Sequence, residues 1–122
     1  MDLDDTDQRN GTGSGITCHS TPDGTVVTLW GEVDAALRES ASETMASLAA
    51  HNAGNPVVVD AKDVTFIDSS GVAFILQVYV LGQETGAPVT LRDPSEAVTE
   101  VLEMVGIGGR LPVVRTAADV PQ

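Results

Sequence analysis

A carboxylate, two hydroxyls and a glycine follow one another at Asp68, Ser69, Ser70 and Gly71, between two apolar runs. Such a cluster is typical of a surface turn, but a serine before an apolar run also suits the start of a helix, where its oxygen accepts a free backbone N–H. The same N–H groups and the helix dipole favour a phosphate group. The cluster therefore predicts a helix start that can carry a phosphorylated serine. The alternative is a plain helix cap, since most capping serines are never modified.

Hydrolytic chemistry at this cluster has little support in the sequence. The nucleophile of many serine hydrolases lies in a Gly-x-Ser-x-Gly motif. Ser69 has Gly71 downstream of it but Ile67 in the upstream position. The general base would have to be His19 or His51, and His51 ends an expected helix, where a cation complements the helix dipole. We therefore predict no catalytic residue and no enzymatic activity.

Metal and cofactor binding are also not indicated. The carboxylates of Asp60, Asp63 and Asp68 are near enough in sequence to share one loop, and three carboxylates can hold a hard cation. However, they lack the calcium-loop spacing, and 18 Asp and Glu residues scatter carboxylates along the whole chain. Cys18 is the one cysteine, so neither a disulfide nor a Cys-cluster metal site can form within the chain. The sequence predicts no metal site and no cofactor.

The charge of the chain limits its partners. Six Lys and Arg residues stand against 18 Asp and Glu, which gives a formal charge of −12. This charge argues against direct binding to nucleic acid or to anionic membrane surfaces, and it favours a partner with a basic surface. There is no apolar run of the roughly 20 residues that a membrane span needs, and no signal peptide at the start. We expect a cytoplasmic protein.

The 122 residues suit one domain around one core. We expect a disordered acidic N-terminal tail over residues 1–15, a folded domain over 16–116 and a C-terminal tail over 117–122, because the first of these has almost no apolar surface to bury. Apolar runs predict strands over 16–20, 25–33, 57–59, 87–91 and 111–115.

Three helices are expected between these strands. They begin at Asp34, near Val72 and at Asp93, and glycines end them at positions 54, 86 and 106. The segment 72–81 also suits a strand, but its length favours a helix, and a helix that is apolar nearly all round must be covered by its own sheet or by a partner. The predicted fold class is α/β, with a mixed β-sheet flanked by α-helices.

Three motifs resemble the STAS family, the sulphate-transporter and anti-sigma-antagonist domain. The segment 66–72 matches the family signature of Phe, a hydrophobe, Asp, Ser, Ser or Thr, Gly, and Leu or Val. The segment 31–34 resembles the family's Gly-Glu-Leu-Asp at the end of a strand, and 101–107 resembles its last helix and Gly-hydrophobe turn. Together these matches cover about residues 25–114, which is nearly all of the expected folded part.

The resemblance implies a function as a phosphorylation-controlled binding protein. Ser69 would accept phosphate from a partner kinase, with Ser70 as the alternative acceptor. The unphosphorylated form would bind that kinase, an anti-sigma factor, and release a sigma factor, and a phosphatase would restore this form. Asp34, Asp68, Ser69, Ser70 and Gly71 are the expected partner-binding residues. The alternative implied by the family is a STAS subunit of a membrane transport or lipid-trafficking complex.

Overall fold

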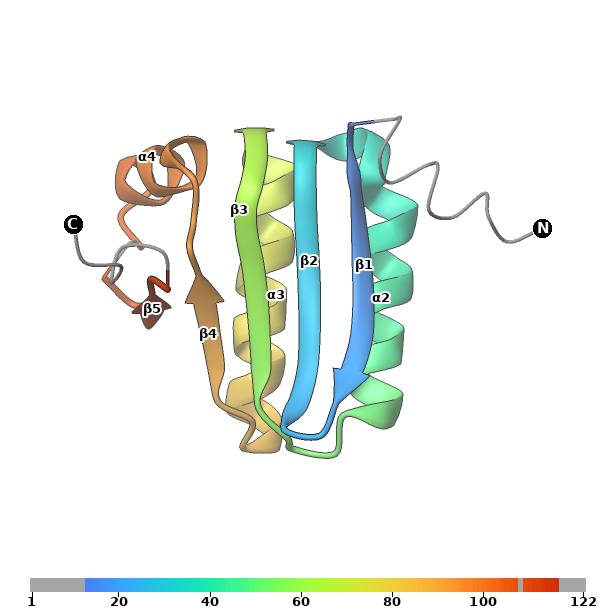
Figure 1. The fold of residues 1–122 in the computed structure, drawn as a ribbon. Coiled ribbons are helices and arrows are strands. Elements are labelled where there is room, and N and C mark those ends of the chain that lie inside the picture. The colour runs from blue at the N-terminus through green and yellow to red at the C-terminus, as the bar shows by residue number, and fades with distance from the viewer. Residues whose placement is uncertain (1–12, 108, 117–122) are drawn as a thin grey trace.

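A five-stranded sheet forms the centre of the computed structural model, which describes residues 13–107 and 109–116 (Figure 1). In the spatial order of the sheet, the strands are β1 (Gly15–Thr21), β2 (Gly24–Val33), β3 (Val57–Ile67), β4 (Val89–Arg92) and β5 (Val113–Val114). The strands β1 and β2 form an antiparallel hairpin, and all other neighbours are parallel. The predicted mixed sheet is therefore confirmed, with its last short strand at an edge.

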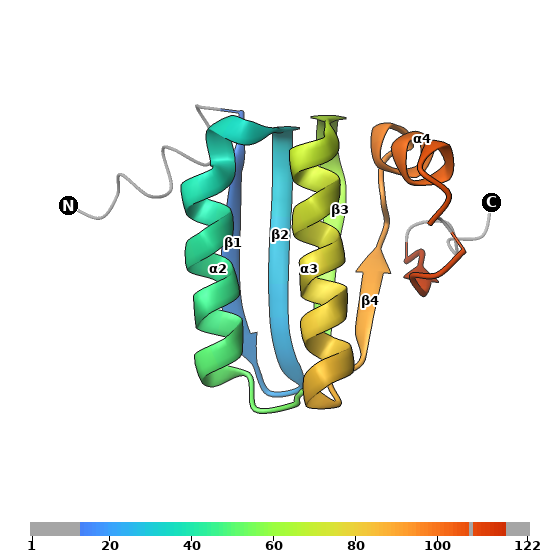
Figure 2. The same cartoon turned by 180° about the vertical axis from the view of Figure 1, so that it is seen from behind.

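Helices cover one face of this sheet. The short 3-10 helix η1 (Ala35–Leu37) leads into α2 (Arg38–His51), and α2 and α3 (Ser69–Thr85) lie side by side across β1 to β3 (Figure 2). The last helix, α4 (Glu96–Met104), lies beside β4 and contacts β3. No described helix covers β1 to β3 on the face seen in Figure 1. The ambiguous segment 72–81 is thus helical, and Gly86 ends its helix in the left-handed conformation, with a φ of 80°.

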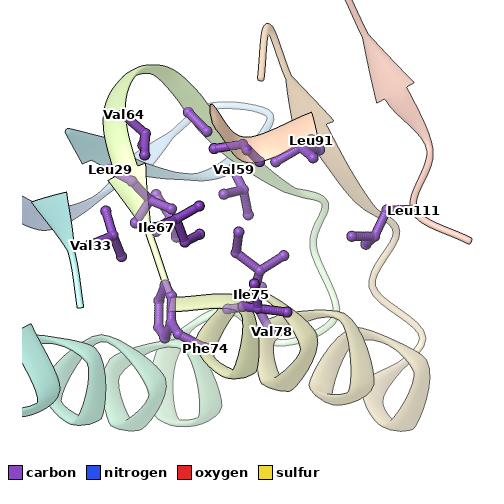
Figure 3. Packing of buried hydrophobic residues seen from close by; sticks show 14 of the residues in the cluster. Leu29, Val33, Val59, Val64, Ile67, Phe74, Ile75, Val78, Leu91 and Leu111 are labelled. Atoms are coloured by element: carbon purple, nitrogen blue, oxygen red, sulfur yellow. The ribbon is translucent and has the colours of Figure 1, made fainter. Parts of the chain in front are cut away.

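Branched aliphatic side chains fill the core between the sheet and α3. Leu29 and Val59 of the sheet are almost fully buried against Ile75 and Val78 of α3 (Figure 3). Phe74 is the buried aromatic residue of this cluster. Burial of such side chains drives folding with roughly 25 cal/mol for each Å² of apolar surface removed from water. This packing fixes α3, and with it the start of the helix at Ser69.

The strand β3 continues for eight positions beyond the strand that the sequence pattern predicted. The expected strand covers residues 57–59, but β3 continues through Asp60, Lys62 and Asp63 to Ile67. The buried Asp60 carboxylate is satisfied there, because Arg92 Nη2 of the neighbouring strand donates to its Oδ2 at 2.8 Å. Shifts in register between β2 and β3 accommodate the polar stretch. A partner 32 residues away therefore makes the polar segment a strand.

The start of α4 also differs from the expectation. Ser95, and not Asp93, caps this helix, and its Oγ accepts a hydrogen bond from Val98 N–H at 3.4 Å. Asp93 lies before the helix with a φ of 50°, and its Oδ1 accepts a hydrogen bond from Thr116 N–H at 2.7 Å. The helix ends at Met104, and Val105, which follows it, is 52% exposed.

The folded part begins slightly earlier than expected. Gly15 is the first residue of β1, and Ser14 Oγ accepts a hydrogen bond from Glu32 N–H at 2.9 Å. The rest of the two expected tails, residues 1–12 and 117–122, lies outside the described residues.

Gly71 lets the first turn of α3 approach the sheet closely. A Cβ atom at this position would lie 2.6 Å from Ile67 Cγ1 and 2.7 Å from the carbonyl oxygen of Val33. The second of these atoms belongs to the backbone of β2 and cannot move aside as a side chain can. The glycine is therefore required for the distance between the helix and the strand.

We predict that Gly71→Ala destabilises the protein. Alanine gains about 1 kcal/mol of helix propensity over glycine, but overpacking costs about 1–3 kcal/mol and dominates here because a backbone oxygen blocks the new methyl group. Urea denaturation measures the change in the free energy of unfolding. Gly109→Ala is the control, since a Cβ there meets nothing within 4 Å. A Gly71→Ala protein as stable as the wild type would contradict the close packing of α3.

The ion pairs of Asp60 make the stability depend on pH. Burial opposes the ionisation of Asp60, but the hydrogen bonds from Arg92 and from Lys62 N–H and the two positive charges prevail, so the pKa of this carboxyl lies below its usual value of 3.8. A carboxyl whose pKa is lowered by folding stabilises the protein above its unfolded pKa, and this contribution disappears as the pH falls through the folded pKa.

We predict that Asp60→Asn lowers the free energy of unfolding at pH 7 by about 1–3 kcal/mol, the range for hydrogen bonds to charged groups. The difference between the variant and the wild type should shrink as the pH falls from 7 through the folded pKa of Asp60, because the wild-type carboxylate becomes neutral there. Denaturation at several pH values measures this convergence. Asp63→Asn is the control, since the Asp63 side chain is 59% exposed. A difference that stays constant with pH would refute the electrostatic explanation.

Candidate functional site

Asp68 caps α3 with its side chain. Its Oδ1 accepts hydrogen bonds from Ser70 N–H at 2.8 Å and from Gly71 N–H at 3.3 Å. Ser69 follows as the first residue of the helix, and its side chain is exposed. The expectation that a serine hydroxyl caps this helix is therefore wrong. The carboxylate satisfies the free N–H groups, which leaves the Ser69 hydroxyl accessible.

Asp34 caps the short helix η1 in the same way, at the end of the neighbouring strand β2. Val33 and Ile67 are partners in the parallel ladder of β2 and β3, so the aspartate after each of them lies at the same edge of the sheet. Both aspartates have extended backbones, and Asp34 Oδ1 accepts a hydrogen bond from Ala36 N–H at 2.9 Å. Asp68 N–H donates to the Val33 carbonyl at 3.3 Å. The sheet thus brings together two site residues that are 34 positions apart.

A hollow of about 300 Å³ opens between the first turns of α2 and α3. Its apolar lining includes Val33, Leu37, Ala41 and Phe74, and its polar lining includes Asp34, Arg38, Ser42, Ser70 and Gln77. Both helices begin at the edge where β2 and β3 end, as Figure 2 shows. The hollow therefore belongs to the same edge as the two aspartates.

The two serines differ in where they lie relative to this hollow. Both side chains are exposed, and Ser70 lines the hollow whereas Ser69 does not. Successive residues of a helix point about 100° apart, since 3.6 residues make a turn. A group attached to Ser70 would therefore enter the space between α2 and α3, whereas a group on Ser69 would not.

Arg38 is the basic residue that lines the hollow. Its guanidinium forms no hydrogen bond or ion pair with any described residue, although Asp34 lies one helical turn before it. In contrast, Arg92 and Lys62 are paired with Asp60. The edge thus presents negative charge at Asp34 and Asp68 and an available positive charge at Arg38.

The other residues singled out for chemistry do not join this site. His51 is the last residue of α2 and lies at the opposite end of that helix from Asp34, and His19 pairs with Val26 far along the hairpin. No histidine is therefore placed to activate Ser69. Among the described residues, no group of three His, Cys, Asp or Glu side chains is placed to hold a metal ion.

The sequence reasoning missed Arg38 and the hollow. The available signal was that two parallel strands are each followed by an aspartate and a helix, so the first turns of both helices must face one another. The position of Arg38, four residues after Asp34, places it one turn into the first of these helices.

Within the part of the chain that the structure describes, no helix combines the length and the apolar character needed to cross a bilayer. The longest, α3, has 17 residues.

Several solved structures share this fold. The anti-sigma factor antagonist SpoIIAA in its unphosphorylated form is 20% identical, with a TM-score of 0.66 over 84% of this chain and 88% of that one. A STAS domain protein from Planctomyces limnophilus is 19% identical, with a TM-score of 0.73 over 84% and 92% of the two chains. An anti-sigma factor antagonist from Mycobacterium paratuberculosis is 22% identical, with a TM-score of 0.67 over 89% and 92%. These likenesses establish the fold.

A search of curated proteins by sequence found no match. A family model described as "Mlab, STAS domain" matches residues 16–115, which covers the sheet, the helices and the edge with Asp34 and Ser69. The chain belongs to the STAS domain family.

Proposed function

We propose that this protein is an anti-sigma factor antagonist. Its unphosphorylated form binds an anti-sigma factor that is also a serine kinase, and the sigma factor is thereby released. Phosphorylation of Ser69 ends the binding, and a phosphatase restores it. The observation that carries this proposal is the exposed Ser69 hydroxyl, held at the start of α3 on the edge that also presents Asp34 and Asp68.

The cap supports an effect of phosphate on binding and not on folding. A phosphate adds about −1.5 to −2 charge at neutral pH. The N–H groups of Ser70 and Gly71 already bind the Asp68 carboxylate, so the phosphate remains in water beside that carboxylate. An exposed dianion costs the fold little, because water solvates it. The same dianion pressed against a partner without a matching cation costs several kcal/mol.

The proposal includes no cofactor and no catalytic activity of the chain itself, and the positions of His19 and His51, away from Ser69, support the second of these. It places the protein in the cytoplasm, with protein partners and without direct binding to nucleic acid or membranes. The strongly acidic charge of −12 supports a partner whose facing surface is basic.

A second candidate function is a STAS subunit of a membrane transport or lipid-trafficking complex. The observation that favours it is the description of the matching family model, which names Mlab and not an anti-sigma factor antagonist. A pull-down from the native cell with Ser69→Ala separates the two candidates. A kinase-like ATPase as the partner supports the first, and a permease or membrane ATPase supports the second.

We predict that Ser69→Glu abolishes binding to the anti-sigma factor with little change in melting temperature. Even about 4 kcal/mol of lost binding free energy weakens the affinity roughly a thousandfold. Ser69→Ala should bind constitutively and resist phosphorylation by the kinase and ATP. Calorimetric titration measures the affinities, and mass spectrometry maps the phosphate.

The matched control is Gln83→Glu, which adds the same negative charge at the exposed far end of α3 and should bind as the wild type does. Phosphate mapped to Ser70 alone would move the acceptor by one residue. Equal affinities of the phosphorylated and unmodified proteins would refute the switch.

We also predict a role for the charge of Asp34 in the association rate. Asp34→Asn keeps a good helix cap but removes the charge, so the fold should be retained. Association with the anti-sigma factor should slow severalfold at low salt and much less at high salt, as expected for a charge at the rim of an interface. Stopped-flow kinetics at several salt concentrations measure this effect. Asp23→Asn, in the hairpin turn at the opposite end of the sheet, is the control. Identical rates for both variants would leave Asp34 as a helix cap only.

A further inference from the structure

The hollow between α2 and α3 has the features of a pocket for a protein side chain. Val33, Leu37, Ala41 and Phe74 contribute apolar lining. Its volume of about 300 Å³ is at the lower end of the range for ligand pockets. Water in contact with such a lining is released when an apolar side chain enters, which favours binding.

The charges around the hollow indicate what the neighbours of that side chain must be. Arg38 lines the hollow, is exposed and has no ion pair with a described residue, so a carboxylate of a partner can reach its guanidinium. The carboxylate of Asp34, also in the lining, attracts a basic residue of a partner. A complementary partner segment therefore carries an apolar side chain with an acidic and a basic residue near it.

We infer that this hollow is the docking pocket for an apolar side chain of the anti-sigma factor, whose adjacent carboxylate pairs with Arg38. The inference rests on the proposed function and extends it. Phosphorylation of Ser69 controls whether the protein binds, whereas the hollow determines which partner binds. Two features support a protein segment as the occupant. The hollow is continuous with the edge that carries Asp34 and Ser70, and its lining combines apolar side chains with one carboxylate, Asp34, and one guanidinium, Arg38.

A larger side chain inside the hollow should weaken the affinity for the partner even when Ser69 is unmodified. Ala41→Leu adds an apolar side chain inside the hollow and keeps a good helix former in α2. Ala46→Leu is the matched control, because Ala46 is exposed on the same helix and does not line the hollow. Interface pockets that hold an anchoring side chain dominate binding, so Ala41→Leu should weaken the affinity at least about tenfold. Ala46→Leu should change it less than about twofold.

The exposed Arg38 provides a second variant that does not depend on repacking. Arg38→Glu should weaken binding at least about tenfold, and Arg38→Lys should retain part of the affinity, since it keeps the charge without the planar fork of the guanidinium. Melting temperatures of all variants check that the fold is intact. Affinities are measured by calorimetry with the anti-sigma factor captured by Ser69→Ala.

The outcomes separate this inference from the proposed function. If Ala41→Leu and Arg38→Glu bind as tightly as the wild type while Ser69→Glu does not, the pocket is refuted and the switch stands. If both hollow variants lose binding while Ser69→Glu keeps it, the pocket stands and the switch is refuted. A wild-type protein that captures no anti-sigma factor would overturn both.

Discussion

The parallel pairing of β2 with β3 is the constraint on which the functional edge depends. Val33 and Ile67 are partners in register, so the chain leaves both strands at the same edge and begins a helix after each. The same aspartate cap follows in both cases, with the carboxylate bound to the N–H group two residues later. Gly71 then allows α3 to lie directly on the end of β2. The two aspartates, the serines and the hollow are consequences of this one pairing.

The cap at Asp68 explains how one modification can act on binding alone. A serine that capped the helix itself would place its phosphate against the free N–H groups of the first turn, and phosphorylation would then change the stability of the helix. Here the carboxylate holds the N–H groups, and the hydroxyl of Ser69 has no structural task in the helix. A change of charge at Ser69 is therefore felt mainly by a molecule that contacts this edge.

Much of the architecture was predictable, because the apolar runs, the glycine stops and the order of elements agree with one another. The position of Asp34 at the same edge as Asp68 was predictable, because each aspartate lies between the end of a strand and the start of a helix. The predictions that failed concern features that local sequence does not determine. The local pattern could not predict that β3 continues through Asp60, because the residue that pairs with the buried Asp60 carboxylate, Arg92, is 32 positions away. It could not choose between Asp93 and Ser95 as the cap of α4, because both residue types cap helices well. It could not reveal the hollow, because that space depends on the distance between two packed helices.

Amide hydrogen exchange of the chain, free and bound to the anti-sigma factor, tests the central claim most directly, since it locates the interface without any substitution. We predict that binding protects the first turns of α2 and α3, over about residues 34–42 and 68–77, and leaves the C-terminal ends of both helices unchanged. Phosphorylated protein mixed with the same partner should show the exchange of the free chain. Protection confined to α4 and β5, or equal protection with and without phosphate, would contradict the account.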